Sequence, residues 1–148
     1  MALPRSYRLP TSKIARCIRE GKSFRGSYIR WRYRLYPPDI QTVRTLKGKT
    51  SDVQKVKGKK IKVKVAVALR RDLRASFIRQ KVKRRVEASF WQALRELRSR
   101  QDTNLVAHGD VGEIEVHIVA IPSVHSYWAE WKFLVRDWVR FLKRVSNY

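Results

Sequence analysis

The chain of 148 residues carries 35 Lys and Arg against 12 Asp and Glu, which gives a formal net charge of +23 at pH 7. Its length suits one domain spanning residues 1–148, and its 43% hydrophobic content supports a core, which excludes a chain disordered throughout. A soluble domain with this charge repels itself unless a polyanion neutralises it. Composition therefore excludes a typical neutral metabolic enzyme. It favours a protein that binds nucleic acid, with an anionic membrane surface as the second candidate.

The charge is concentrated in the first two-thirds of the chain. Residues 1–100 hold 30 basic and 6 acidic side chains, whereas residues 101–148 hold 5 and 6. We therefore expect the first two-thirds to build the binding surface and the last third mainly to complete the core.

Metal and targeting signals are weak. Cys17 is the only cysteine, and the histidines His108, His117 and His125 lack ligand spacing. No apolar run has the length of a signal peptide or of a transmembrane helix. The sequence thus predicts a cytoplasmic protein that binds no metal or cofactor itself and does not enter a membrane.

The first predicted element is a short helix over residues 12–20. It places Ile14, Cys17 and Ile18 on one face, and Gly21 follows where a left-handed terminating residue is typical. Cys17 is interpreted as a small buried hydrophobic side chain rather than a reactive thiol.

Two strands with alternating apolar and basic residues follow. Segments 28–36 and 60–69 both have a period of two, which predicts strands. If these strands are neighbours, one face of the sheet carries only positive charges, which repel each other unless an anion lies across them. Between them, residues 37–59 are rich in Pro, Lys and Gly and predict a long basic hairpin loop or arm.

The remaining elements complete the fold. A long helix over 76–100 is followed by a loop over 102–112, a strand over 113–121 and a last helix over 127–145. The last helix is expected to bury Trp128, Trp131, Val135, Trp138, Leu142 and Val145. The predicted fold class is α+β, an α-β-β-α-β-α sandwich with one mixed sheet packed against helices. At least one strand pair is parallel, because a helix links the second strand to the third.

The densest basic segment is 70–85, which holds eight cations in sixteen residues. Phe77, Ile78, Val82 and Val86 occupy core-facing positions in it, so we expect a helix anchored by its apolar side that presents cations to phosphates. The predicted RNA contacts are Arg70, Arg71, Arg74, Arg79, Gln80, Lys81, Lys83, Arg84 and Arg85.

No motif in the chain points to catalysis by protein side chains. There is no Ser/His/Asp set, no paired carboxylates in a motif and no phosphate-cradling Gly loop. His117 falls in the middle of a predicted strand and His125 in a loop, so structural or solvated roles are expected for both. The protein is therefore expected to contribute binding rather than chemistry.

Several segments resemble the protein subunit of bacterial ribonuclease P. The early turn of that family is similar to Gly21-Lys22-Ser23-Phe24, and its basic Arg-Asn-Arg helix start is similar to the segment 79–84. Its third strand and last helix are similar to segments 116–122 and 131–144. Departures occur at Gln80 and Lys81 within the basic motif and at the long segment 37–59.

The resemblance implies a division of labour. The RNA subunit hydrolyses the phosphodiester bond with Mg²⁺, and the protein, which is not catalytic alone, binds the catalytic RNA and the 5′ leader of precursor tRNA. The candidates for the leader groove are Tyr28, Arg30, Arg32, Arg34, Lys62 and Lys64.

Two alternatives stay open. One is a structural, ribosome-associated RNA-binding relative, which the altered Arg79-Gln80-Lys81 segment permits. The other is a protein that binds DNA or a membrane surface. It is less favoured, because no helix-turn-helix spacing occurs and the cations fall on strands as well as helices.

Overall fold

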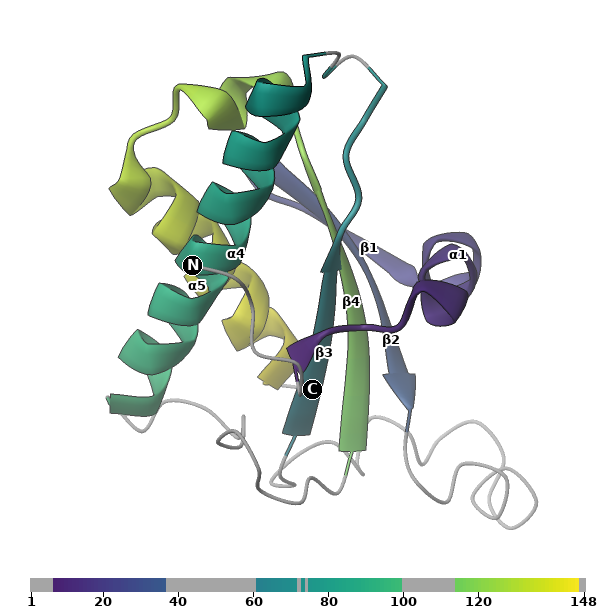
Figure 1. The fold of residues 1–148 in the computed structure, drawn as a ribbon. Coiled ribbons are helices and arrows are strands. Elements are labelled where there is room, and N and C mark those ends of the chain that lie inside the picture. The colour runs from purple at the N-terminus through teal and green to yellow at the C-terminus, as the bar shows by residue number, and fades with distance from the viewer. Residues whose placement is uncertain (1–6, 37–60, 72, 74, 100–113, 147–148) are drawn as a thin grey trace, which may run out of the picture.

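The computed structural model describes residues 7–36, 61–71, 73, 75–99 and 114–146, so the predicted loops over 37–59 and 102–112 lie outside the described residues. In chain order the elements are α1 (Thr11–Glu20), β1 (Lys22–Arg25), β2 (Ile29–Tyr36), β3 (Ile61–Val67), α4 (Ser76–Ser99), β4 (Ile114–Pro122), the 3-10 helix η3 (Val124–Tyr127) and α5 (Trp131–Ser146). A four-stranded sheet in the order β1–β2–β4–β3 lies between two layers (Figure 1). Helices α4 and α5 cover one face, and α1 packs on the other (Figure 1).

The sheet is mixed. β1 pairs antiparallel with β2, β2 pairs antiparallel with β4, and β3 pairs parallel with β4. The parallel pair arises because the chain leaves β3, passes through α4 on one face and returns as β4. The predicted α+β architecture with one mixed sheet is confirmed.

The predicted adjacency of the two basic strands is wrong, because β4 lies between β2 and β3. Every residue from Val116 to Ala120 is buried, and a strand that is buried on both faces belongs in the centre of a sheet. The alternating basic strands are exposed on one face and therefore lie to either side of it.

Strand β1 was not expected from the sequence. It has only four residues, Lys22–Arg25, and three of them are exposed. Gly21, which precedes it, is extended with φ −77° rather than left-handed, so the predicted terminating conformation is wrong. Glycine is needed here for close packing, because a Cβ atom would lie 2.3 Å from the carbonyl oxygen of Cys17 and 2.9 Å from that of Tyr33.

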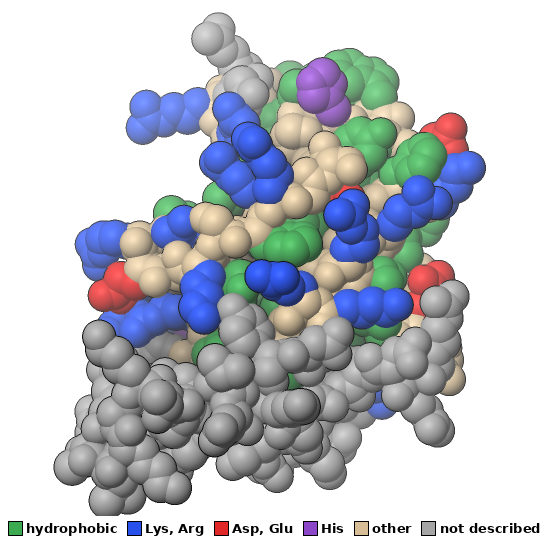
Figure 2. Space-filling view, turned by 180° about the vertical axis from the view of Figure 1, so that it is seen from behind, with side chains coloured by type: hydrophobic (Ala, Val, Ile, Leu, Met, Phe, Trp, Pro, Cys, Tyr) green, Lys and Arg blue, Asp and Glu red, His purple; other side chains and the backbone are tan. Residues whose placement is uncertain are grey.

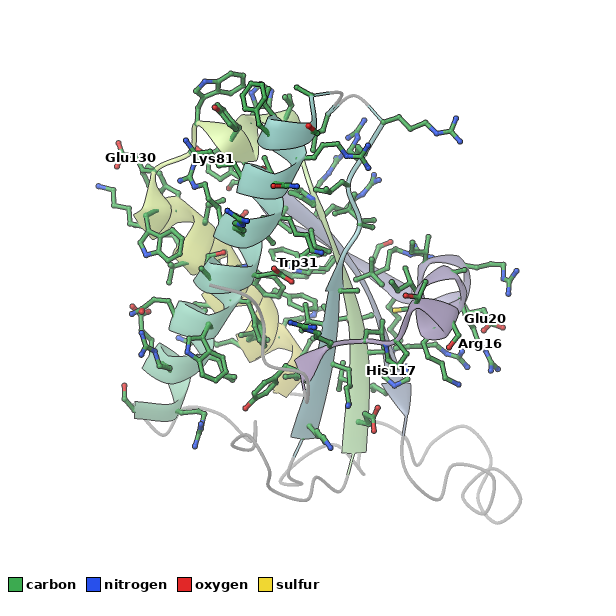
Figure 3. All side chains as sticks on the ribbon, viewed as in Figure 1. Arg16, Glu20, Trp31, Lys81, His117 and Glu130 are labelled. Carbon is green, nitrogen blue, oxygen red and sulfur yellow. The ribbon has the colours of Figure 1, made fainter. Side chains whose placement is uncertain are left out.

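The main core lies between the sheet and helices α4 and α5. At its centre the Trp31 ring stacks on Phe141 with centroids 4.6 Å apart, and Trp138 meets Trp31 edge-on at 5.3 Å. Burying aromatic side chains of this size supplies a large share of a domain's hydrophobic stabilisation. Figure 3 shows Trp31 in the space between the sheet and the helices.

Three aromatic residues that were predicted to be buried are exposed. Trp128 is 69% exposed, Phe77 68% and Trp131 43%, whereas Trp138 is fully buried as expected. The predicted last helix begins too early, because residues 124–127 form η3 and α5 starts only at Trp131. A helical repeat counted through this turn therefore assigns Trp128 to the wrong face.

A smaller cluster holds α1 against the other face of the sheet. Cys17 packs there with Leu9 and Val119 and is 1% exposed. Its thiol contacts the carbonyl oxygen of Arg32 at 3.4 Å and that of His117 at 3.3 Å. Burial raises the pKa of this thiol to about 11. The interpretation of Cys17 as a small buried side chain is confirmed.

Candidate nucleic-acid interface

Polar and basic side chains cover the outer face of α4 near its N-terminus. On the opposite side Val82 and Val86 are fully buried, so the helix is anchored by its apolar face. A helix fixed in this way can meet phosphates at constant spacing with little ordering cost. The exposed members of the predicted set on this helix are Arg79, Gln80, Lys81, Lys83 and Arg84.

Arg85 differs from its neighbours on α4. Its guanidinium donates to the carbonyl oxygens of Ser126 at 3.2 Å and Tyr127 at 2.5 Å, and also to that of Ala129. The side chain is half-buried. Arg85 therefore fastens the turn between η3 and α5 to α4, and its donors point into the protein.

The predicted strand-face arginines Arg32 and Arg34 bind α1. Arg32 donates from Nε to the carbonyl oxygen of Ile18 at 2.8 Å and from a terminal nitrogen to Ser23 Oγ at 2.5 Å. Arg34 donates to Glu20 Oε2 at 2.8 Å. These contacts neutralise the C-terminal end of α1, where carbonyl groups carry partial negative charge. Both arginines thus hold a helix in place.

The lysines of β3 lie beside an acidic residue. Lys62 and Lys64 are half-exposed, and the register sets them opposite Glu115 and His117 of β4. Nε2 of His117 lies 2.9 Å from Glu115 Oε1. The expectation that only positive charges line this face is therefore wrong at β4.

A pocket of about 340 Å³ opens at the turn between β1 and β2. This volume lies in the range of ordinary small-ligand sites. Residues from three distant segments meet there: Arg25, Tyr28, Arg30, Arg70, Ser123 and His125. The sequence analysis assigned Arg30 to the strand face and Arg70 to the basic segment, as two separate surfaces. In the structure both residues line one pocket.

The charge of this pocket favours an anion. Arg25 and Arg30 are directly opposite each other in the β1–β2 register, and both are exposed. Like charges at directly opposite positions of an antiparallel pair destabilise it. A phosphate that lies between the two guanidinium groups would remove this repulsion. Arg71 nearby in sequence is exposed, and Arg74 lies outside the described residues.

A buried carboxylate fixes the shape of the pocket. Asp137 of α5 accepts hydrogen bonds from the backbone N–H groups of Ser27 at 3.1 Å, Tyr28 at 2.7 Å and Ile29 at 3.2 Å. Gly26 allows this approach, because a Cβ atom there would lie 2.8 Å from Asp137 Oδ2. The turn that carries Tyr28 is therefore held in one conformation.

Sequence reasoning did not identify Arg25, Ser123, His125 or Asp137 as parts of this site. Arg25 lies in the short strand that was not expected. Asp137 did leave a signal, since it interrupts an apolar helical face between Leu134 and Phe141. A carboxylate at such a position is usually paired or hydrogen-bonded.

Lysine and arginine predominate among the charged side chains on the face seen in Figure 2, and acidic groups are few. Within the residues that the structure describes, no group of three or more His, Cys, Asp and Glu side chains is placed to hold a metal ion. Over the same residues, no helix is long and apolar enough to cross a membrane.

Solved structures with a similar fold are ribonuclease P proteins. The RNase P protein from Thermotoga maritima is 18% identical, with 93% of this chain and 96% of that chain covered and a TM-score of 0.54. The RNase P protein of Staphylococcus aureus is 9% identical, with 97% of each chain covered and a TM-score of 0.52. No protein-family model and no curated protein matches the chain. The chain therefore adopts the fold of bacterial RNase P proteins, as the sequence resemblance predicted.

Proposed function

We propose that this chain is the protein subunit of a ribonuclease P, which binds the catalytic RNA and the 5′ leader of precursor tRNA. The observation that carries the proposal is the arginine-rich pocket with Tyr28, Arg30 and Arg70 on an RNase P protein fold. The formal net charge of +23 supports a polyanionic partner.

The two basic regions suit different forms of RNA. The outer face of α4 carries exposed cations on a rigid support, which suits the phosphates of a folded RNA. The pocket combines guanidinium groups with the half-buried Tyr28, whose ring stacks on Phe133 with centroids 6.4 Å apart. Aromatic rings beside a positive groove are typical of sites that bind single strands. We therefore assign the folded catalytic RNA to α4 and the unpaired leader to the pocket.

The chemistry is assigned to the RNA. In this proposal the RNA holds Mg²⁺ and cleaves the phosphodiester bond, while the protein supplies affinity and position. His117 is buried beside Glu115, which suits a structural role. His125 lines the pocket, and in this proposal it contacts the leader.

Affinity for precursor tRNA with and without a leader tests the pocket. The variant Arg25→Ala/Arg30→Ala removes the facing guanidinium groups without touching Arg32, whose loss would loosen α1. We expect this variant to bind leader-bearing tRNA about 5- to 50-fold more weakly in the presence of the catalytic RNA, since charged hydrogen bonds contribute roughly 1–3 kcal/mol. Binding of leaderless tRNA should stay within about twofold of the wild type. Equal losses for both substrates would contradict a leader site.

The RNA that crosslinks to the protein in cells distinguishes the two RNA-binding functions. Recovery of ribonuclease P RNA supports the proposal. Recovery of ribosomal RNA without it would instead support the alternative, a structural RNA-binding relative.

A further inference from the structure

Phe77 and Trp128 form an exposed aromatic surface where the start of α4 meets η3. They are 68% and 69% exposed, and Trp131 at the start of α5 is 43% exposed. Large aromatic side chains gathered at one exposed place usually mark a binding surface, whereas scattered ones do not. Ser123 and His125, which line the pocket, immediately precede the turn that carries Trp128, so the chain runs directly from the pocket to this turn.

The backbone under Trp128 is held firmly. Arg85 donates to the carbonyl oxygens on either side of it, those of Tyr127 and Ala129. Within the turn, the N–H of Trp128 donates to the carbonyl oxygen of His125 at 3.2 Å, and that of Ala129 donates to the same oxygen at 3.1 Å. A ligand that stacks on Trp128 would therefore meet a fixed platform with little ordering cost.

Cations are interleaved with these rings. Nζ of Lys81 lies 4.9 Å from the centroid of the Tyr127 ring, which meets Trp128 edge-on at 5.1 Å. Phe77, Lys81 and Arg85 recur every four residues and so share one face of α4. Because Lys81 and Arg85 both contact the turn, Phe77 lies on the same side of α4 as Trp128. Figure 3 shows Lys81 and Glu130 at this end of the molecule, far from Arg16 and Glu20 of α1.

This composition favours RNA over a protein as the occupant. Lysine is depleted at the centres of protein–protein interfaces, whereas single-stranded nucleic acid is bound by rings next to cations. One acidic group is close: Glu130 Oε2 lies 3.5 Å from Nζ of Lys132, and both side chains are exposed, so their charges offset locally. Lys81 is exposed and places its positive charge beside Tyr127.

We propose that Phe77 and Trp128 stack on unpaired bases of bound RNA while Lys81 contacts a phosphate of the same strand. The surface would hold nucleotides that continue from the pocket. This inference requires that the protein binds RNA, but it does not require that the RNA is precursor tRNA or ribonuclease P RNA.

Binding of two synthetic strands by the full chain tests the proposal. One is an unstructured oligoadenylate, and the other is an abasic oligomer with the same backbone and length. Trp128→Ala should weaken binding of oligoadenylate about 5- to 100-fold, the range expected for loss of one stacked base, and leave binding of the abasic strand unchanged. Phe77→Ala should show the same selectivity. Lys81→Gln should weaken both strands and lower the slope of log affinity against log salt by about 0.7.

Ile18→Ala is the matched control, because it removes an exposed apolar side chain of α1 on the other face of the sheet. It should change neither strand's affinity. If Trp128→Ala and Phe77→Ala bind oligoadenylate as tightly as the wild type, stacking at this surface is overturned. A second result would also overturn the stacking proposal: Trp128→Ala dissociates a dimer of the free protein but keeps its affinity for RNA. That result would assign the surface to a protein–protein contact. Neither result would affect the leader experiment, which uses Arg25 and Arg30.

Discussion

Asp137 is the acidic side chain on which the pocket depends most directly. It is 3% exposed and accepts three backbone N–H groups from the turn between β1 and β2. A carboxylate in a core is tolerated when hydrogen bonds of this kind replace its hydration. Asp137 thus joins α5, which lies in the least basic part of the chain, to the turn that presents Tyr28.

Asp137→Ala should destabilise the protein by about 2–4 kcal/mol, because the turn loses charge-assisted hydrogen bonds and keeps buried N–H groups without acceptors. Asp137→Asn should lose less, since one amide oxygen can still accept. Denaturant unfolding of both variants measures the loss. Glu130→Ala, an exposed acidic change near the start of α5, is the control and should stay within about 0.5 kcal/mol of the wild type. A similar stability for Asp137→Ala and Glu130→Ala would contradict the anchoring role.

Glu87 provides a test with pH. Burial raises the pKa of its carboxyl, although Lys83 and Arg8 act in the opposite direction. The folded state then holds this proton more tightly than the unfolded state, so the stability contributed by Glu87 falls as pH rises through the raised pKa. Glu87→Gln should therefore raise the melting temperature by about 1–3 °C near neutral pH and by less in acid.

Glu20→Gln should behave in the opposite way. A hydrogen bond from Arg16 lowers the pKa of the Glu20 carboxyl, so its contribution to stability is present above its unfolded pKa and is lost in acid. This variant should be less stable than the wild type near neutral pH, and the difference should shrink as pH falls. Melting temperatures of Glu87→Gln and Glu20→Gln, measured at several pH values, test both predictions. Parallel behaviour of the two variants would refute the assigned environments.

At the scale of elements, α4 combines three tasks on three sides. Val82, Val86 and Phe90 bury one side in the core. Arg85 and Lys81 hold the η3 turn on a second side. A third side carries the exposed cations Arg79, Lys83 and Arg84. A helix with a fixed core face keeps the spacing of its exposed cations constant.

Replacing Arg79, Lys83 and Arg84 of α4 with Ala should weaken RNA binding and reduce its salt dependence. Each lost phosphate contact should lower the log–log slope by about 0.9 on duplex and about 0.7 on single strands. Folding should persist, because all three side chains are exposed. The matched control replaces Arg95 and Arg98, exposed cations near the C-terminal end of the same helix. Equal slope changes per charge at both ends would mean that α4 has no specific RNA-binding face.

The sequence predicted most helices and strands, but not which strands are adjacent in the sheet. Alternation in β2 and β3 and the apolar repeats of α4 and α5 are local patterns, and each became the expected element. The place of β4 between two strands depends on contacts distant in sequence, which no local pattern contains. The wrong prediction that Trp128 is buried has a related cause. The helical repeat was extended through residues 124–130, which form a turn outside α5.

The candidate site was predicted only in part for the same reason. Basic side chains can be counted from the sequence, but their use depends on partners. Arg32 and Arg85 bind backbone carbonyl groups inside the protein, whereas Arg30 and Arg70 meet at the pocket. Nothing in the basic pattern itself distinguishes these arginines.

At the scale of the whole molecule, the proposed function assigns binding to the protein and cleavage to the RNA. The protein offers a broad positive surface, and the described histidines His117 and His125 lie in different environments, one buried and one exposed. In the proposed function these two histidines take no part in proton transfer, and the protein contributes binding.

Protein freed of RNA should not cleave precursor tRNA at any Mg²⁺ concentration, whereas addition of a ribonuclease P RNA from the same source should give cleavage at the 5′ end. Gel analysis of the products measures this. The control is RNA-free protein carrying His125→Ala, which should be indistinguishable from the RNA-free wild type. Cleavage by RNA-free wild type that is lost in this variant, or in His117→Ala, would show that the protein supplies the catalyst.

The central position of β4 also has a consequence for how the chain folds. β1 and β2 can pair as a local hairpin. Among the described strands β3 pairs only with β4, so beyond a single bridge from Val65 to Arg8 it has no strand partner until residues 114–122 have been synthesised. Contacts this distant in sequence are slow to form, because a long loop must close before they are made. The segment with 30 of the 35 basic side chains therefore leaves the ribosome before its sheet can close. The basic surface is thus translated first, but it reaches its final form only after the last strand has been added.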